Sequence, residues 1–382
     1  MKGFQFLIFV ILTFCCWGLY GPLLHVGQEI MGGGGGRKSM LRPFICVGIA
    51  YFAIAVLFPI FVLVTKGEKG HWTVSGFFWS FVAGGVGAVG ALGIILAFKF
   101  NGKPSYVMPL VFGLAPIVNT FVTMMMARTF KQASAIFYIG ILIVAIGAAG
   151  VLVFKPSKAK QEPAVESAAE VVVVDAFQDQ HVSTTASIRD DSSSSSAEVP
   201  AGSFLWVTLS IALTAVCWGA YGPVLHKGQA KMGGSRLRPF LCVGLAYFAI
   251  AVVGPLLMLS GFPEPGGWSP DGNWYGIPWS LGAGAAGAVG ALGIIYAFNS
   301  GGKPLFIMPL VFGFAPVINT FTTIFTNNLS GPVNNLFFAS LAMVIIGAVM
   351  VLVFAPRGKP PAKPATDPIE EEPQPTTEPE AE

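Results

Sequence analysis

The sequence predicts an all-α polytopic membrane protein with ten transmembrane helices, arranged as two inverted five-helix repeats. Two observations carry this prediction. Of the 382 residues, 54% are hydrophobic and 11% are charged, whereas soluble domains carry about 25% charged residues. Long segments also occur twice in the same order: LRPFICVGIAYFAIAV at 41–56 returns as LRPFLCVGLAYFAIAV at 237–252. A duplicated apolar unit is typical of transporters built from two structural repeats.

Each copy contains five apolar segments long enough to cross a bilayer, which takes about 20 residues. They lie near 4–24, 43–65, 75–98, 105–127 and 135–154, and near 203–225, 239–260, 277–298, 305–326 and 335–354. The first could be read as a signal peptide, but its counterpart is internal, so we expect both to be retained helices. Because five is odd, the second copy enters the membrane from the opposite side, which predicts an inverted pair.

These segments divide the chain into four parts. Residues 1–155 form the first five-helix repeat and residues 203–356 the second. Residues 156–202 are acidic and serine-rich, and residues 357–382 are rich in proline and glutamate. Both compositions are typical of disordered segments, because they offer too little apolar surface to form a core.

The loop charges predict an orientation, because Lys and Arg collect on the cytoplasmic side of a membrane. In the second copy the Lys and Arg residues of the loops lie on one side, which places the C-terminus in the cytoplasm. With ten spans the N-terminus is expected there too. The expected location is the plasma (inner) membrane. The first copy disagrees: Arg42 and Lys103 match Arg238 and Lys303, although inversion puts the partners on opposite sides. Either these residues have a structural or binding role, or the span count is wrong.

Composition also narrows the class of function. The five cysteines fit neither a zinc site nor a secreted disulfide framework, and no nucleophile–base set is visible. We therefore expect no enzyme activity, no metal and no cofactor. The net charge of +3 includes no basic cluster suited to nucleic acid. The expected partners are a small-molecule solute and the lipid bilayer, and a homodimer is left open.

An aromatic pair lies in the first span of each copy. Trp17 and Tyr20 match Trp218 and Tyr221. Such a pair can stack on the ring of a sugar or a base and donate hydrogen bonds. The alternative is an aromatic belt at the membrane interface. We take the four residues as candidate substrate contacts.

A proline and a histidine follow each aromatic pair. Pro22 and Pro223 are expected to kink or end their helices and so free backbone carbonyls, which is typical of transport sites. His25 and His226 come three residues later. They are expected either to contact the solute or gate it, one at each membrane face, or to anchor the helix end at the interface.

The fourth span of each copy carries a matching set of proline and polar residues. The set consists of Pro116, Asn119 and Thr120, and of Pro316, Asn319 and Thr320. Steps of three or four place these residues on one helix face, and each proline leaves a carbonyl without its usual donor. An amide in hydrocarbon needs hydrogen-bond partners. The asparagines are therefore expected either to bind a polar solute or to join two helices.

Further motifs frame the two halves. Each half opens with a Trp-Gly pair and closes with an IGxxxVxxF helix, at Ile146–Phe154 and Ile346–Phe354. With the fourth span, which reads PLVFGLAPIVNTF, they resemble the drug/metabolite transporter superfamily and its EamA-like ten-helix members. A glutamate common there after the fourth span is missing, and the neutral aromatic and amide-bearing spans look more like the sugar, nucleoside or ureide branches. The resemblance implies a central cavity lined by the first four spans of each half.

We therefore expect a secondary transporter that moves a small polar metabolite, such as a sugar, nucleoside or ureide, by alternating access. No span holds Asp, Glu, Lys or Arg near its middle, which favours an uncharged or weakly charged solute. One alternative is an exporter or flippase of amphipathic compounds, although these usually need an acid within the membrane. Another is a non-transporting scaffold or sensor, which has no need to repeat Pro, Asn and His positions in both halves.

Overall fold

The structure, a computed structural model, describes residues 5–33, 36–155, 201–264, 266–268, 273–302, 304–326 and 333–356. Within these ranges the chain is helical between its loops and turns and contains no strand. The linker expected at 156–202 lies outside the described residues except for its last two, which begin a helix. The tail expected at 357–382 lies outside them entirely.

The first half forms helices α1 to α6. They are α1 (Gln5–Met31), α2 (Leu41–Phe52), α3 (Phe58–Thr65), α4 (Val74–Lys99), α5 (Pro104–Ala127) and α6 (Ala135–Val153). A π-helical turn at Ala53–Leu57 joins α2 to α3, so that the two form one membrane-length segment. A short 3-10 turn at Phe130–Gln132 precedes α6.

The second half forms the equivalent helices α7 to α12. They are α7 (Ala201–Lys231), α8 (Leu237–Tyr247), α9 (Gly254–Gly261), α10 (Gly276–Asn299), α11 (Pro304–Thr326) and α12 (Asn335–Val353). A π-helical turn at Phe248–Val253 joins α8 to α9, and a 3-10 turn at Asn273–Tyr275 precedes α10. In all, ten segments of the described chain are long and apolar enough to span a membrane. This confirms the prediction of an all-α integral membrane protein.

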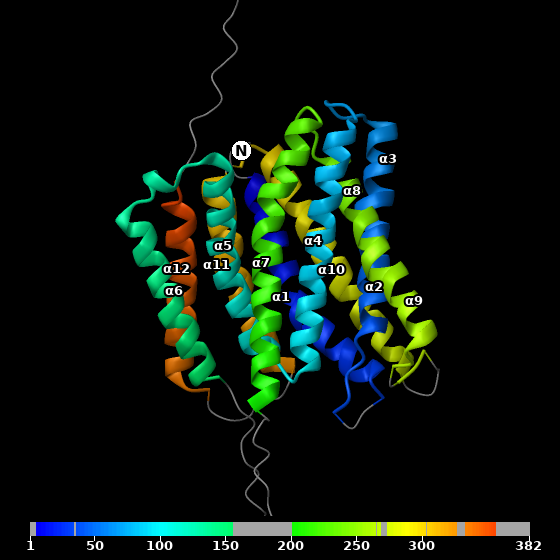
Figure 1. Ribbon diagram of the computed structural model, residues 1–382, viewed down its shortest axis with the longest axis vertical. Coiled ribbons are helices and arrows are strands. Elements are labelled where there is room, and N and C mark those ends of the chain that lie inside the picture. The colour runs from blue at the N-terminus through cyan, green and yellow to red at the C-terminus, as the bar shows by residue number, and fades with distance from the viewer. Residues whose placement is uncertain are drawn as a thin grey trace, which may run out of the picture.

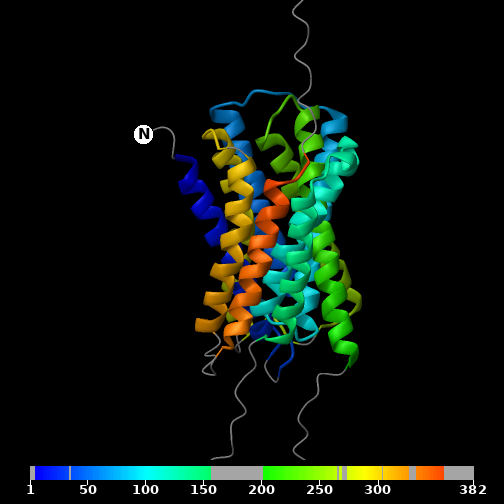
Figure 2. The same cartoon turned by 90° about the vertical axis from the view of Figure 1, so that its left-hand side faces the viewer.

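Equivalent helices make equivalent contacts across the two halves. α1 packs against α10 and α11, as α7 packs against α4 and α5. α2 packs against α10, as α8 packs against α4. The helices run along the long axis of the bundle, with α6 and α12 paired on one side and α2, α3, α8 and α9 on the other (Figure 1). The second view shows the same bundle from the side on which α6 and α12 lie (Figure 2). Each half therefore completes the packing of the other.

None of the four helices ends at the prolines expected to break them. α1 continues past Pro22 and α7 past Pro223, and α5 and α11 likewise contain their prolines. Of the two outcomes expected at Pro22 and Pro223, a kink or a helix end, the helix end does not occur. The reason is that a proline removes one backbone hydrogen bond, and a neighbouring helix can satisfy the freed carbonyl. Pro223 frees the carbonyl of Gly219, and the amide of Asn119 on α5 donates to that oxygen at 3.2 Å.

Candidate functional site

A cavity of about 90 Å³ lies among α1, α2, α4 and α5 of the first half and α7, α8, α10 and α11 of the second. Its wall is formed by Trp17, Tyr20, Tyr51, Gly87, Phe112, Trp218, Tyr221, Tyr247, Gly287, Ala291 and Phe312. All except Ala291 form equivalent pairs, one member from each half. The wall contains no acidic or basic side chain. The cavity is thus an apolar, aromatic chamber to which both copies contribute nearly the same residues.

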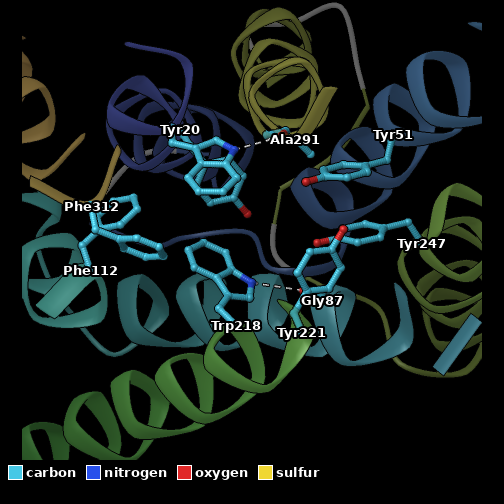
Figure 3. A pocket seen from close by; sticks show the side chains of 11 residues that line it. Tyr20, Tyr51, Gly87, Phe112, Trp218, Tyr221, Tyr247, Ala291 and Phe312 are labelled. Carbon is cyan, nitrogen blue, oxygen red and sulfur yellow. Dashed lines mark hydrogen bonds between the residues drawn. The ribbon is translucent and has the colours of Figure 1, made fainter. Parts of the chain in front are cut away.

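The aromatic rings enclose the chamber on several sides (Figure 3). Phe112 and Phe312 close one side, with ring centroids 6.0 Å apart in an edge-to-face arrangement. Tyr51 and Tyr247 close the opposite side, with stacked rings whose centroids are 3.8 Å apart and whose planes are nearly parallel, at 6° to each other. An edge-to-face contact such as that of Phe112 with Phe312 adds roughly 0.5–1.5 kcal/mol beyond burial. The rings therefore hold one another in a fixed frame.

The two tryptophans are oriented by their indole N–H groups. Trp17 Nε1 donates to the carbonyl oxygen of Gly287 at 3.2 Å, and Trp218 Nε1 donates to that of Gly87 at 3.2 Å. A buried indole N–H needs such an acceptor. A side chain on the glycine one turn further along α10 or α4 would overlap the indole ring. Because both N–H groups are already bonded, the indoles offer a solute their ring faces and no hydrogen-bond donor.

One tyrosine hydroxyl of the wall stands out because it is buried without a hydrogen-bond partner. Tyr20 is 4% exposed, and its hydroxyl has no hydrogen-bond partner among the described residues. Buried hydroxyls usually have a partner. Tyr20 therefore carries a hydroxyl in the chamber wall that a bound solute can use.

Four of the ten predicted contact residues line the chamber, namely Trp17, Tyr20, Trp218 and Tyr221. The two asparagines instead join helices. Asn119 donates to the carbonyl of Gly219 on α7, and Asn319 donates to that of Pro104 at 2.8 Å on α5. The hydroxyl of Thr120 bonds within its own helix. Asn119, Thr120, Asn319 and Thr320 are all absent from the chamber wall. This placement matches the helix-joining alternative for the asparagines.

Several wall residues were missed by the sequence reasoning as solute contacts. They are Tyr51 and Tyr247 from the LRPF segments, Phe112 and Phe312 from the fourth spans, and Ala291 from the third. The sequence contained a partial indication of the two tyrosines, because both recur at the same position of a repeated 16-residue motif. An aromatic residue in an apolar span nevertheless looks the same whether it packs in a core or faces a chamber.

The repeated arginines are held by acidic residues of the opposite half. Arg42 Nη1 lies 3.7 Å from Glu264 Oε2, and Arg238 Nη1 lies 3.6 Å from Glu68 Oε2. Glu68 and Glu264 occupy equivalent places after α3 and α9. The charge conflict between the two copies therefore has a structural explanation at the arginines. Each positive charge is retained because it is paired with a carboxylate across the two halves.

Each of these carboxylates also caps a helix. Glu264 accepts hydrogen bonds from the backbone N–H groups of Met40 and Leu41 and from the hydroxyl of Ser39, at the start of α2. Glu68 does the same for Arg236, Leu237 and Ser235 at the start of α8. The first N–H groups of a helix have no internal acceptor and attract an anion. We call these arrangements the Glu264 clamp (with Ser39–Arg42) and the Glu68 clamp (with Ser235–Arg238).

The starts of α2 and α8, and with them the two clamps, lie at opposite ends of the bundle (Figure 1). Neither of the two predicted histidines belongs to the chamber wall. His25 is buried near the Glu264 clamp, where its Nε2 lies 3.1 Å from Lys38 Nζ. His226 is exposed, in the last turns of α7. The histidines are thus equivalent in sequence but not in environment.

No family model matches the chain, and no curated protein matches it. Chemically, the chamber can stack a flat solute between ring faces and exchange a hydrogen bond with the hydroxyl of Tyr20. Its wall offers no nucleophile activated by a base and no charged group.

Proposed function

We propose that the protein is a secondary transporter that carries a small, neutral metabolite with a flat ring by alternating access. The observation that carries this proposal is the chamber whose wall consists of the same aromatic residues from both halves. A site at the interface of two structural repeats is typical of secondary transporters. The alternative of a scaffold gives no reason for a chamber that both halves line with the same residues and that holds an unpartnered hydroxyl.

The chemistry of the wall narrows the solute class. Both indole N–H groups are bonded to backbone, and the wall contains no carboxylate. A sugar, with hydroxyls around its ring, would lose hydrogen bonds to water there without regaining them. An organic cation would find ring faces but no counter-charge. Among the sugar, nucleoside and ureide classes, the ring-bearing nucleobase or ureide solutes fit best, since they can stack and bond the Tyr20 hydroxyl.

Alternating access requires that the two ends of the bundle open in turn. In support of this, each end is held by a clamp of the same composition, the Glu68 clamp or the Glu264 clamp. We propose that the two five-helix halves are inverted repeats, so that equivalent motions of the two halves open opposite faces. Membership of the drug/metabolite transporter superfamily, a plasma (inner) membrane location and cytoplasmic termini are parts of the same proposal.

Transport in proteoliposomes tests the proposal. Labelled adenine, uracil, allantoin and glucose are the probes, and counterflow of at least one ring-bearing probe is expected, with little for glucose. Tyr20→Phe keeps the ring and removes only the unpartnered hydroxyl. It should leave folding intact and weaken binding of a probe that uses the hydroxyl by about tenfold, the equivalent of one hydrogen bond.

Two tryptophans on α7 provide a matched pair for the same experiment. Trp218→Ala removes a wall ring and should abolish counterflow. Trp206→Ala removes an indole that is 53% exposed and lies outside the wall, and it should change counterflow little. Equal loss in both variants would contradict a role for the chamber. Absence of flux for every probe would overturn transport, and glucose flux alone would overturn the solute class.

A further inference from the structure

A cluster of ionisable side chains surrounds His25 at the Glu264 end of the bundle. His25 is 5% exposed, and its Nε2 lies 3.1 Å from Lys38 Nζ and 3.6 Å from Glu29 Oε1. The ring of Phe98 packs edge-on against the imidazole. Lys103, in the turn between α4 and α5, adds a further positive charge that acts on the imidazole. The cluster thus joins the end of α1, the loop before α2 and the turn after α4.

His25 and Lys38 cannot both carry a positive charge in this geometry. Two unit charges 3.1 Å apart repel by roughly 5 kcal/mol even at an effective dielectric constant of about 20. The Lys38 ammonium therefore donates to a neutral imidazole. That leaves the proton of His25 on Nδ1, which has no partner among the described residues. Burial, the largest influence, lowers the pKa of Lys38 from its ordinary value, Glu29 raises it, and Lys103 lowers it.

Protonation of His25 must therefore displace Lys38. An imidazolium would repel the ammonium and turn to Glu29, whose carboxylate is one helical turn away on α1 and already within 3.6 Å. Glu29 is half exposed at 49% and can move to meet the ring. The cluster thus has two arrangements that differ by one proton on His25 and by the position of Lys38.

The position of Lys38 is connected to the Glu264 clamp. Its own carbonyl accepts a hydrogen bond from Lys99 Nζ at 2.8 Å. The next residue, Ser39, bonds through its carbonyl to the side chain of Gln28 at 3.1 Å and through its hydroxyl to Glu264. Displacement of Lys38 would pull residues 38–41 away from the carboxylate that holds the start of α2.

The other end of the bundle has the clamp without the cluster. Gly234 stands in the place of Lys38 and Ala230 in the place of Glu29. His226, the counterpart of His25, is exposed. Protonation of His226 therefore displaces no buried cation. The difference confines any proton-driven movement to the Glu264 end.

We propose that His25 is a proton-binding site, and that occupation of this site displaces Lys38 and opens the Glu264 clamp. The proton then binds tightly to the open arrangement and weakly to the closed one. A ligand shifts a conformational equilibrium by its difference in affinity for the two states, and the coupling is reciprocal. The proton site stands on its own geometry. Its use in driving solute movement rests on the proposed transport function.

Amide hydrogen exchange of the unmodified chain tests the site without a solute. The amides of residues 40–41 report on the Glu264 clamp directly, and that of residue 39, which donates to the carbonyl of Gln28, reports on the same loop. The amides of residues 236–237 report on the Glu68 clamp as an internal control. On lowering the pH from about 8 to about 6, protection at 39–41 should fall by up to about tenfold per pH unit, the limit for one titrating group. Protection at 236–237, corrected for intrinsic rate, should stay nearly constant.

Variants of the cluster make the test specific. His25→Gln should remove the pH response at 39–41, and the matched control His226→Gln should keep it. Lys38→Met should also remove the pH response, because it has no ammonium that His25 could displace. This variant provides the test if His25→Gln does not fold. An equal response at both clamps in the parent, or a response that survives in either His25→Gln or Lys38→Met, would overturn the proposal.

Proton movement during counterflow then tests the coupling. In vesicles that contain a pH-sensitive dye, solute entry in the parent should be accompanied by proton movement. His25→Gln should retain solute exchange but lose accumulation driven by a pH gradient. Solute flux without proton movement in the parent would overturn the coupling. If no probe is transported at all, the proposed function fails, and the exchange experiment alone decides whether His25 is a proton site.

Discussion

The two ends of the bundle have nearly the same clamp but very different surroundings. Arg42–Glu264 and Arg238–Glu68 are 3.7 Å and 3.6 Å apart, and each glutamate binds the first amides of the helix that carries its arginine. Next to one clamp lies the buried cluster of His25, whereas the equivalent histidine at the other end is exposed.

The difference teaches which features the fold itself requires. A helix start and a largely buried guanidinium need an anion wherever they occur, because both lose water on packing. Both copies meet this need in the same way. A buried histidine beside a lysine has no such structural benefit, since burying charged groups is costly. The clamps therefore meet a need that the fold has at both ends, whereas the cluster at one end is explained by the proton site that we propose.

The largest expected effect comes from removing the clamp carboxylates. Glu264→Ala should lower the free energy of unfolding in detergent by about 3–5 kcal/mol, the usual cost of leaving a buried charge unpaired. Glu68→Ala should cost less, because the Glu68 side chain is 19% exposed and that of Glu264 is 8% exposed. Denaturant titration measures both, with the half-exposed Glu29→Ala as control. A larger loss for Glu68→Ala would break the comparison of the two clamps.

An intermediate effect is expected at the two asparagines. Asn119→Ala should cost about 1–2 kcal/mol and Asn319→Ala about 0.6 kcal/mol, values within the range of hydrogen bonds between membrane helices. Asn119→Ala is expected to cost more because of Pro223. This proline removes the backbone N–H that would otherwise donate to the carbonyl of Gly219, so no helical donor can replace the amide of Asn119. Equal unfolding free energies for the two variants would show that the freed carbonyl finds another donor.

The smallest effect at neutral pH is expected for Lys38→Met. Replacement of a buried charged group by an apolar residue of similar size is often close to neutral, so the change should stay within about 1 kcal/mol. The pH dependence is more informative. Burial lowers the pKa of Lys38 from its ordinary value of 10.5, so the unfolded chain binds more protons than the folded one below that value.

Stability rises with pH wherever the unfolded chain binds more protons than the folded one. The stability of the parent therefore rises with pH from the lowered pKa of Lys38 up to about 10.5. Lys38→Met should lack that rise. Melting temperatures over this alkaline range test the point, with the exposed Lys131→Met as a control that keeps the rise. If the stability of Lys38→Met rises with pH as much as that of the parent, the rise comes from other groups. Lys38 would then no longer distinguish the two ends of the bundle.

The sequence by itself determined the spans and the correspondence between the copies. Membrane-length helices follow from runs of apolar residues, because the preference for the bilayer adds up along the chain and depends little on distant contacts. For the same reason, the repeated motifs already indicated that Trp17 and Tyr20 have counterparts in Trp218 and Tyr221. Four of the chamber residues could therefore be named from the sequence.

Only the tertiary structure decided which side chains meet. The rings of Tyr51 and Tyr247 stack on each other, and the asparagines donate hydrogen bonds to neighbouring helices. Glu68 and Glu264 form ion pairs with the arginines of the opposite half. The tertiary structure also separated His25 from His226 by their neighbours. These contacts join residues far apart in the chain, and their energies depend on burial and on the distance between groups, neither of which is encoded in local pattern.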